Sequence, residues 1–166
     1  SGRTKDTNIN WIATELNKIG IMLKEARVIE DKKKTIINTV LEFSNKFTYV
    51  FTSGGIGPTH DDITTESIAA AFQVNLEKNE IAMKLLKKHY EKSKIEFNEA
   101  RQKMAIIPKG ASLINNPVSV APGFNIKNVY VFAGVPKIMQ SMFHSISSKL
   151  KGGVITKSKT ITCNIG

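Results

Sequence analysis

A glycine-rich stretch between a strand-like run and a helix-like run is the feature that most limits how this chain can fold. The run 47–51 is β-branched and aromatic, as expected for a covered strand, and residues 52–64 read TSGGIGPTHDDIT. Three glycines within four residues let the backbone adopt positive φ values and turn its N–H groups toward one point. This order predicts a strand-to-helix turn that can hold a phosphate or a carboxylate.

Two aspartates in the same stretch leave its chemistry open. Asp61 and Asp62 would repel a phosphate unless they hold a metal ion, accept from a sugar or pterin group, or act as a base. The stretch matches neither the triphosphate-binding loop nor the dinucleotide fingerprint. A simple alternative is a tight turn in which both aspartates are helix-entry residues, with Thr64 as the cap of the helix and Glu66 in its first turn.

Upstream of this turn, helix and strand patterns alternate. Apolar residues at helical spacing predict a helix over 9–19, the run 21–29 is typical of a strand, and a second helix over 31–43 would be capped by Asp31. The order predicts a βαβ unit with helices on both faces of a parallel sheet. Such sheets bind ligands at the carboxyl ends of their strands, which is where the glycine stretch lies.

The second half of the chain continues the alternation. The expected elements are helices over 79–94 and 98–105, a turn over 106–110, short strands over 113–114 and 124–126, a central strand over 128–132, a helix beginning at Pro136, and an edge strand over 154–165. The methionine and phenylalanine stripe of the last helix is expected to face the core. The predicted fold class is α/β, a three-layer sandwich with a mostly parallel central sheet flanked by helices, plus a small hairpin-like subregion.

Four segments, in chain order, carry a family resemblance. Residues 1–8 match a G-x-x-x-D-T-N pattern, 52–64 match SGG-x-GPT-x-DD-x-T, 116–124 match N-P-x-G-x-A-P-G-F, and 133–136 match PGVP. Together they resemble the molybdopterin-binding (molybdenum-cofactor biosynthesis) domain family, in its competence/damage-inducible protein A (CinA-like) branch. The chain departs from that pattern at Ser119, where the family has glycine, and at Ala133, where it has proline. The family's first strand, with its glutamate, would precede Ser1.

The resemblance implies a site and two functions. The first is binding of a phosphate-bearing pterin such as molybdopterin, or of a nucleotide. The second is metal-dependent hydrolysis of ADP-ribose-like dinucleotides, with Mg²⁺ or a similar cation held by Asp6, Asp61 and Asp62. The candidate catalytic residues are Asp62, Asp61 and His60. The candidate ligand-binding residues are Thr52, Ser53, Gly54, Gly55, Gly57, Pro58, Thr59, Asp6, Asn8, Gly134 and Pro136. A third reading is a non-catalytic oligomerisation domain, and relatives commonly form trimers or dimers.

The amino-acid composition of the chain limits these interpretations. The chain has 166 residues and 41% hydrophobic content, which suits one domain over 1–166, and the final segment is compatible with one domain of a longer protein. The net charge of +10 favours anionic ligands, but the lysines are spread and not interleaved with aromatics, so nucleic acid is not an expected partner. The lone Cys163 and the absence of a charged-then-apolar leader or membrane span predict a cytoplasmic protein.

Overall fold

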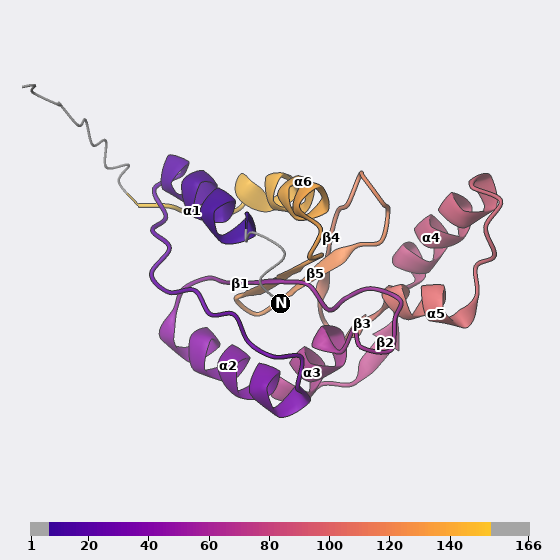
Figure 1. Ribbon diagram of the computed structural model, residues 1–166, viewed down its shortest axis with the longest axis horizontal. Helices are drawn as coiled ribbons and strands as arrows, with labels where there is room; N and C mark the ends of the chain where they lie inside the picture. The colour runs from indigo at the N-terminus through magenta and orange to yellow at the C-terminus, as the bar shows by residue number, and fades with distance from the viewer. Residues whose placement is uncertain (1–6, 154–166) are drawn as a thin grey trace, which may run out of the picture.

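The computed structural model describes residues 7–153, which form a three-layer α/β sandwich. Figure 1 shows a central sheet with α1 and α6 on one face and α2 and α3 on the other. The helices of these layers are α1 (Asn8–Lys18), α2 (Lys33–Lys46), α3 (Thr64–Ala71) and α6 (Pro136–Ser147). The sheet contains β1 (Val50–Ser53), β4 (Ser112–Ile114), β5 (Gly123–Ile126) and β6 (Val129–Phe132), in the order β1-β6-β5-β4. The predicted α/β sandwich is confirmed.

Strand pairing within the described sheet is mixed, whereas the sequence predicted a mostly parallel sheet. Strands β1 and β6 are parallel, while β5 pairs antiparallel with both β6 and β4. Two residues connect β5 to β6, and the first of them, Lys127, adopts a φ of 52°. A positive φ is typical of two-residue hairpin turns. The short strands predicted at 113–114 and 124–126 therefore pair antiparallel with each other, and both belong to the main sheet.

The core lies on both faces of the sheet because successive strand side chains point to opposite sides. Val129 and Val131 pack toward α2 and α3, whereas Phe132 packs toward α1 and α6. The apolar stripe of α6 is buried as predicted, and it consists of Met139, Met142, Phe143 and Ile146. Both helical layers are therefore fixed against β1 and β6, the two strands that lead into the candidate site.

A small subregion lies beside the sandwich, at the right of Figure 1. It contains β2 (Leu76–Lys78), α4 (Glu80–Lys92), α5 (Glu99–Gln102), the short 3₁₀ helix η1 (Lys103–Ala105) and β3 (Ile106–Pro108). Strands β2 and β3 pair antiparallel. The sequence predicted the helices but placed a turn at 106–110. A strand of three residues carries too little alternation to be recognised, and β2 is exposed along its whole length.

The segment 21–29 is not a strand, which corrects the sequence prediction. Its side chains alternate in burial, with Met22 64% exposed between the half-buried Ile21 and Leu23, but no ladder forms in the described residues. Ion pairs attach it to α2 instead. Arg27 binds Glu42 at 2.6 Å, and its guanidinium lies 4.7 Å from the ring centre of Phe43. The apolar run therefore predicted a strand where the structure has none.

Two helix caps also differ from the prediction. Helix α2 begins after Lys32, so Asp31 does not cap it, and α3 begins after Ile63, so Thr64 is its first residue rather than its cap. Neither helix has a side-chain cap, although Glu66 occupies the first turn of α3 as predicted. The predicted strand 154–165 and Cys163 lie outside the described residues. Among residues 7–153, no helix has the length and apolar character needed to cross a bilayer.

Candidate ligand-binding site

The turns that follow β1 and β6 meet at one end of the sheet. These strands are parallel neighbours, so their carboxyl ends lie side by side, and the Gly54 N–H donates to the Phe132 carbonyl at 2.9 Å. The side-chain amide of Asn8 donates to the Ser53 hydroxyl at 3.1 Å and to the Gly134 carbonyl at 2.9 Å. Three predicted ligand-binding residues that lie far apart in the sequence are thus brought together: Asn8, Ser53 and Gly134. Asn8 is also the first residue of α1.

Two helices begin at this junction. Helix α1 starts at Asn8 and α6 starts at Pro136, and neither has a side-chain cap or an acidic residue in its first turn. Helix α2 also lacks both, whereas α3, α4 and α5 each carry a glutamate there. A helix N-terminus carries a partial positive charge and outward-pointing N–H groups. Because two helices begin side by side at the junction, its backbone favours an anion.

The three glycines of the loop have different structural roles. Gly54 (φ +107°) and Gly55 (φ +67°) adopt the left-handed side of backbone space, which favours glycine. A Cβ on Gly55 would overlap the Thr64 hydroxyl, and a Cβ on Gly57 would lie 2.5 Å from the Asp62 carboxylate. A Cβ on Gly54 would find open space, with the Gly134 Cα 4.0 Å away. Gly55 and Gly57 therefore make room for the loop's own side chains, and Gly54 faces the junction.

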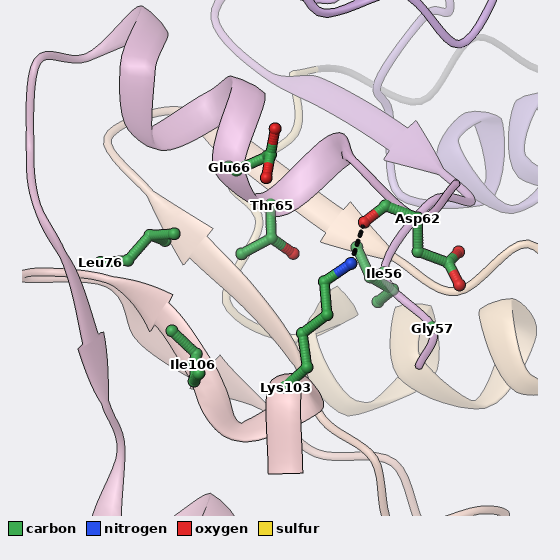
Figure 2. A pocket seen from close by; sticks show the side chains of 8 residues that line it. All are labelled: Ile56, Gly57, Asp62, Thr65, Glu66, Leu76, Lys103 and Ile106. Carbon is green, nitrogen blue, oxygen red and sulfur yellow. Dashed lines mark hydrogen bonds between the residues drawn. The ribbon is translucent and has the colours of Figure 1, made fainter. Parts of the chain in front are cut away.

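Asp62 closes a turn rather than facing outward. Its carboxylate accepts from the Thr59 N–H at 3.0 Å and from the Thr59 hydroxyl, while the Asp62 N–H donates to the Thr59 carbonyl at 3.3 Å. Burial alone would raise the pKa of Asp62, but the hydrogen bonds from Thr59 and from the Gly57 N–H outweigh it and lower the pKa below its ordinary value. Figure 2 shows the carboxylate directed toward Gly57.

A lysine that the sequence analysis missed supports the same turn. Lys103 of η1 donates from its Nζ to the Thr59 carbonyl at 2.9 Å and to the Asp62 carbonyl at 2.8 Å, and Figure 2 shows the latter bond. It is one wall of a cavity of about 90 Å³ behind the loop. The cavity is lined by Ile56, Gly57, Asp62, Thr65, Glu66, Leu76, Lys103 and Ile106. An engineered cavity of roughly 150 Å³ holds one benzene ring, so this one is too small for a bicyclic base.

The remaining predicted residues are dispersed around the junction. Pro58, His60 and Asp61 are exposed on the loop, and Pro136 is exposed at the start of α6. Thr52 occupies the sheet face opposite to Ser53, because neighbouring residues of a strand point to opposite sides. Its hydroxyl is buried without a hydrogen-bond partner in the described residues. The structure therefore does not bring Thr52 to the Asn8 side of the sheet.

The donors available for a metal ion are few. Asp6 lies outside the described residues, and within 7–153 no group of three or more His, Cys, Asp or Glu side chains gathers. Asp61 is exposed. The largest of the effects that lower the pKa of Asp61 is a hydrogen bond from the Thr59 side chain, so its carboxylate stays ionised. The Asp62 carboxylate already accepts hydrogen bonds from Thr59, which leaves Asp61 as the carboxylate of this pair that could contact a cation. Mg²⁺ is commonly bound by one or two carboxylates together with waters and substrate phosphates, so water and substrate would have to supply the other ligands.

The two departures from the family pattern are accommodated by local contacts. The buried Asn116 donates to the Ser119 hydroxyl at 2.6 Å and accepts from the Ser119 N–H at 3.1 Å, so this serine belongs to the hydrogen bonding of its own loop. The N–H of Ala133 lies 3.4 Å from the Met142 sulfur, and its side chain packs against the α6 core. Neither replacement removes a contact of the Asn8–Ser53–Gly134 junction.

Replacing Asp62 with asparagine should lower the free energy of unfolding by about 1 kcal/mol at pH 7, because charge-assisted hydrogen bonds become neutral ones. The pKa of Asp62 is lowered by folding, so its contribution is complete above about pH 4 and is lost as the pH falls through the lower folded value. Urea unfolding at pH 7 and pH 3 should therefore show the difference from the parent shrinking in acid. Asp61→Asn is the control with a smaller expected change, and a pH-independent loss at Asp62 would contradict this account.

Comparisons with known proteins agree over most of the chain. The family model described as "Probable molybdopterin binding domain" matches residues 1–151. A protein of Sulfurisphaera tokodaii is 39% identical in an alignment 154 residues long that covers 90% of this chain and 59% of that protein. A protein of Aeropyrum pernix is 30% identical in an alignment 168 residues long, gaps included, that covers 99% of this chain and 63% of that protein. The chain thus spans about three fifths of the length of these relatives.

Solved structures show the same fold. The crystal structure of CinA, a protein with unknown function from Thermoplasma acidophilum, has a TM-score of 0.82, 32% identity and 89% coverage of both chains. The tungsten cofactor synthesizing protein MoaB from Pyrococcus furiosus has a TM-score of 0.53 and 21% identity, covering 89% of this chain and 82% of that one. At that identity the likeness shows the fold alone. With the family match over 1–151, the chain belongs to the molybdopterin-binding domain family.

Proposed function

We propose that this domain binds a small molecule with a phosphate-bearing tail, a pterin such as molybdopterin or a nucleotide, at the junction of the β1 and β6 turns. The observation that carries the proposal is the meeting of two helix N-termini with Ser53 and Gly54. Aligned N–H groups and an open approach to the backbone are what a phosphate requires. The net charge of +10 adds general attraction for an anion.

The Ser53 hydroxyl and the main chain at Gly54 would contact the phosphate. Asn8 would position them, because its side-chain amide donates one hydrogen to the Ser53 hydroxyl and the other to the Gly134 carbonyl. Gly54 would let the phosphate approach the main chain, since its missing Cβ leaves open space. The flat ring would lie outside the small cavity near Lys103, which is too small to contain it. The family to which the chain belongs supports a pterin as the ring.

Titration calorimetry with ADP-ribose and with a pterin phosphate tests the proposal. The parent protein should bind at least one of them saturably, and added inorganic phosphate should compete because it occupies the same N–H groups. Binding of neither ligand, or binding that phosphate does not weaken, would contradict the proposed site. Since these relatives are longer than this chain, the same titration on the Sulfurisphaera tokodaii relative shows whether a longer chain binds the ligands more tightly.

A metal-dependent pyrophosphatase acting on ADP-ribose-like dinucleotides is the second candidate, and the exposed, ionised Asp61 favours it. We expect ligand binding to persist in chelator, because backbone N–H groups and hydroxyls carry the phosphate without a cation. We expect any hydrolysis of ADP-ribose to stop in chelator and to return with Mg²⁺. Formation of AMP and ribose 5-phosphate, the two products of pyrophosphate cleavage, is measured in both conditions. Hydrolysis that continues in chelator would contradict the metal requirement.

Cytoplasmic location and assembly into dimers or trimers remain part of the proposal. The expectation of a homo-oligomer rests on the family resemblance, and light scattering of the purified protein measures the mass directly. The described residues do expose large apolar side chains, such as Ile81 at 66% and Leu85 at 43%, on one side of α4. These residues are the first to substitute if scattering reports more than one subunit.

A further inference from the structure

Lys103 bridges the small subregion and the glycine loop. Its Nζ contacts the carbonyls of Thr59 and Asp62, which are the first and last residues of one turn and lie more than forty positions before it. We propose that Lys103 is a positioning residue for the candidate ligand site, and that it holds the Thr59–Asp62 turn in the shape in which the loop receives a phosphate-bearing ligand. The role of Lys103 in ligand binding rests on the proposed function, whereas its contact with the turn does not.

Three sets of hydrogen bonds stabilise the Thr59–Asp62 turn, and Lys103 supplies the set that comes from outside the loop. The Asp62 N–H closes the turn on the Thr59 carbonyl, and the Asp62 carboxylate binds the Thr59 N–H and hydroxyl. The ammonium group binds the two carbonyls from the other side, as Figure 2 shows for Asp62. Hydrogen bonds to a charged donor are stronger than neutral ones, so losing two of them loosens the turn substantially.

The position of Lys103 in the fold explains how its contact with the turn can affect the ligand site. It begins η1, which follows α5 and leads directly into β3, so its backbone is fixed by the subregion. Gly57, which packs against the Asp62 carboxylate, is on the same loop as Gly54 at the junction. A change at Lys103 is therefore transmitted to the anion site through the Thr59–Asp62 turn, without contact between the lysine and Asn8 or Ser53 being required.

Lys103→Met tests the inference, because methionine keeps the length of the side chain and removes every donor. Lys109→Met is the matched control, since Lys109 is exposed beside the same strand and its side chain makes no hydrogen bond or ion pair among the described residues. Amide hydrogen exchange over 57–62 is measured without ligand, and ADP-ribose and pterin-phosphate affinities are measured by calorimetry. Lys103→Arg, which retains charge and donors, is the conservative variant.

We expect Lys103→Met to speed exchange in the turn about tenfold or more, to leave β6 unchanged, and to weaken ligand binding about tenfold. Lys103→Arg should recover part of both effects, and Lys109→Met should match the parent. Unchanged exchange with weakened binding would overturn positioning in favour of direct contact with the ligand. Faster exchange throughout the sheet would overturn it in favour of a general structural role. If the parent binds neither ligand, the proposed function fails while the exchange result still decides the positioning role.

Discussion

Replacing Gly55 with alanine is expected to lower the free energy of unfolding by about 2–4 kcal/mol. Part of the cost is the left-handed backbone, since Gly55 has a φ of +67° and residues with a Cβ pay for that conformation. The larger part is steric, because the new methyl group would overlap the hydroxyl of Thr64, which is buried at the start of α3. The loop or the helix must move to admit it.

Gly110→Ala provides the matched control for this result. Gly110 has a φ of +82°, but no atom lies within 4 Å of the position of an added Cβ, so its replacement costs backbone strain alone. Urea unfolding of both variants should show the larger loss at Gly55. Equal losses of unfolding free energy in the two variants would mean that Thr64 moves aside at no cost in stability. Because Gly55→Ala damages the loop itself, loss of ligand binding in that variant would not locate the ligand.

Replacing Ser53 with aspartate is expected to weaken binding of a phosphate-bearing ligand by at least about tenfold. Two like charges about 4 Å apart repel by roughly 4 kcal/mol near a protein surface, and exposure and salt reduce that value. The fold should tolerate the change, because Ser53 is exposed and an aspartate would still offer an acceptor to the Asn8 amide at the positive end of α1.

Ser53→Ala separates the effect of charge from the loss of the hydroxyl. It removes one hydrogen-bonding group and adds no charge, so its affinity should lie between those of the parent and the aspartate variant. Calorimetric titration of the three proteins at low and high salt measures both effects. An aspartate variant that binds as tightly as the parent, with a normal unfolding transition, would remove Ser53 from the ligand site.

The parts of the fold that follow from local pattern were predictable from the sequence. Apolar spacing located α1, α2, α4 and α6, and the β-branched and aromatic run located β1 together with the turn that follows it. Pairing was less predictable, because hydrogen bonds between strands depend on partners far away in the chain. The segment 21–29 has apolar residues typical of a strand, yet ion pairs with α2 hold it in the structure.

The sequence says more about which candidate residues lie near one another than about the direction of their side chains. The family resemblance brought Asn8, Ser53 and Gly134 into one set, and the parallel pairing of β1 with β6 explains why they meet. The direction of a side chain in a loop is not encoded in residue type, so Asp62 could equally have faced a ligand or its own turn. No sequence signal connects Lys103 to the loop, because the contact depends on how the subregion packs against it.

An amide NMR titration of the protein with ADP-ribose and with a pterin phosphate, in the presence of chelator, tests the central claim most directly. It reports where a ligand lies without any substitution. The account predicts that the largest shift changes occur at Asn8, at 53–57 and at Gly134, with weaker changes over the Thr59–Asp62 turn. Shift changes confined to another surface, such as the groove of α4 near Met83 and Phe97, or no changes with either ligand, would contradict it.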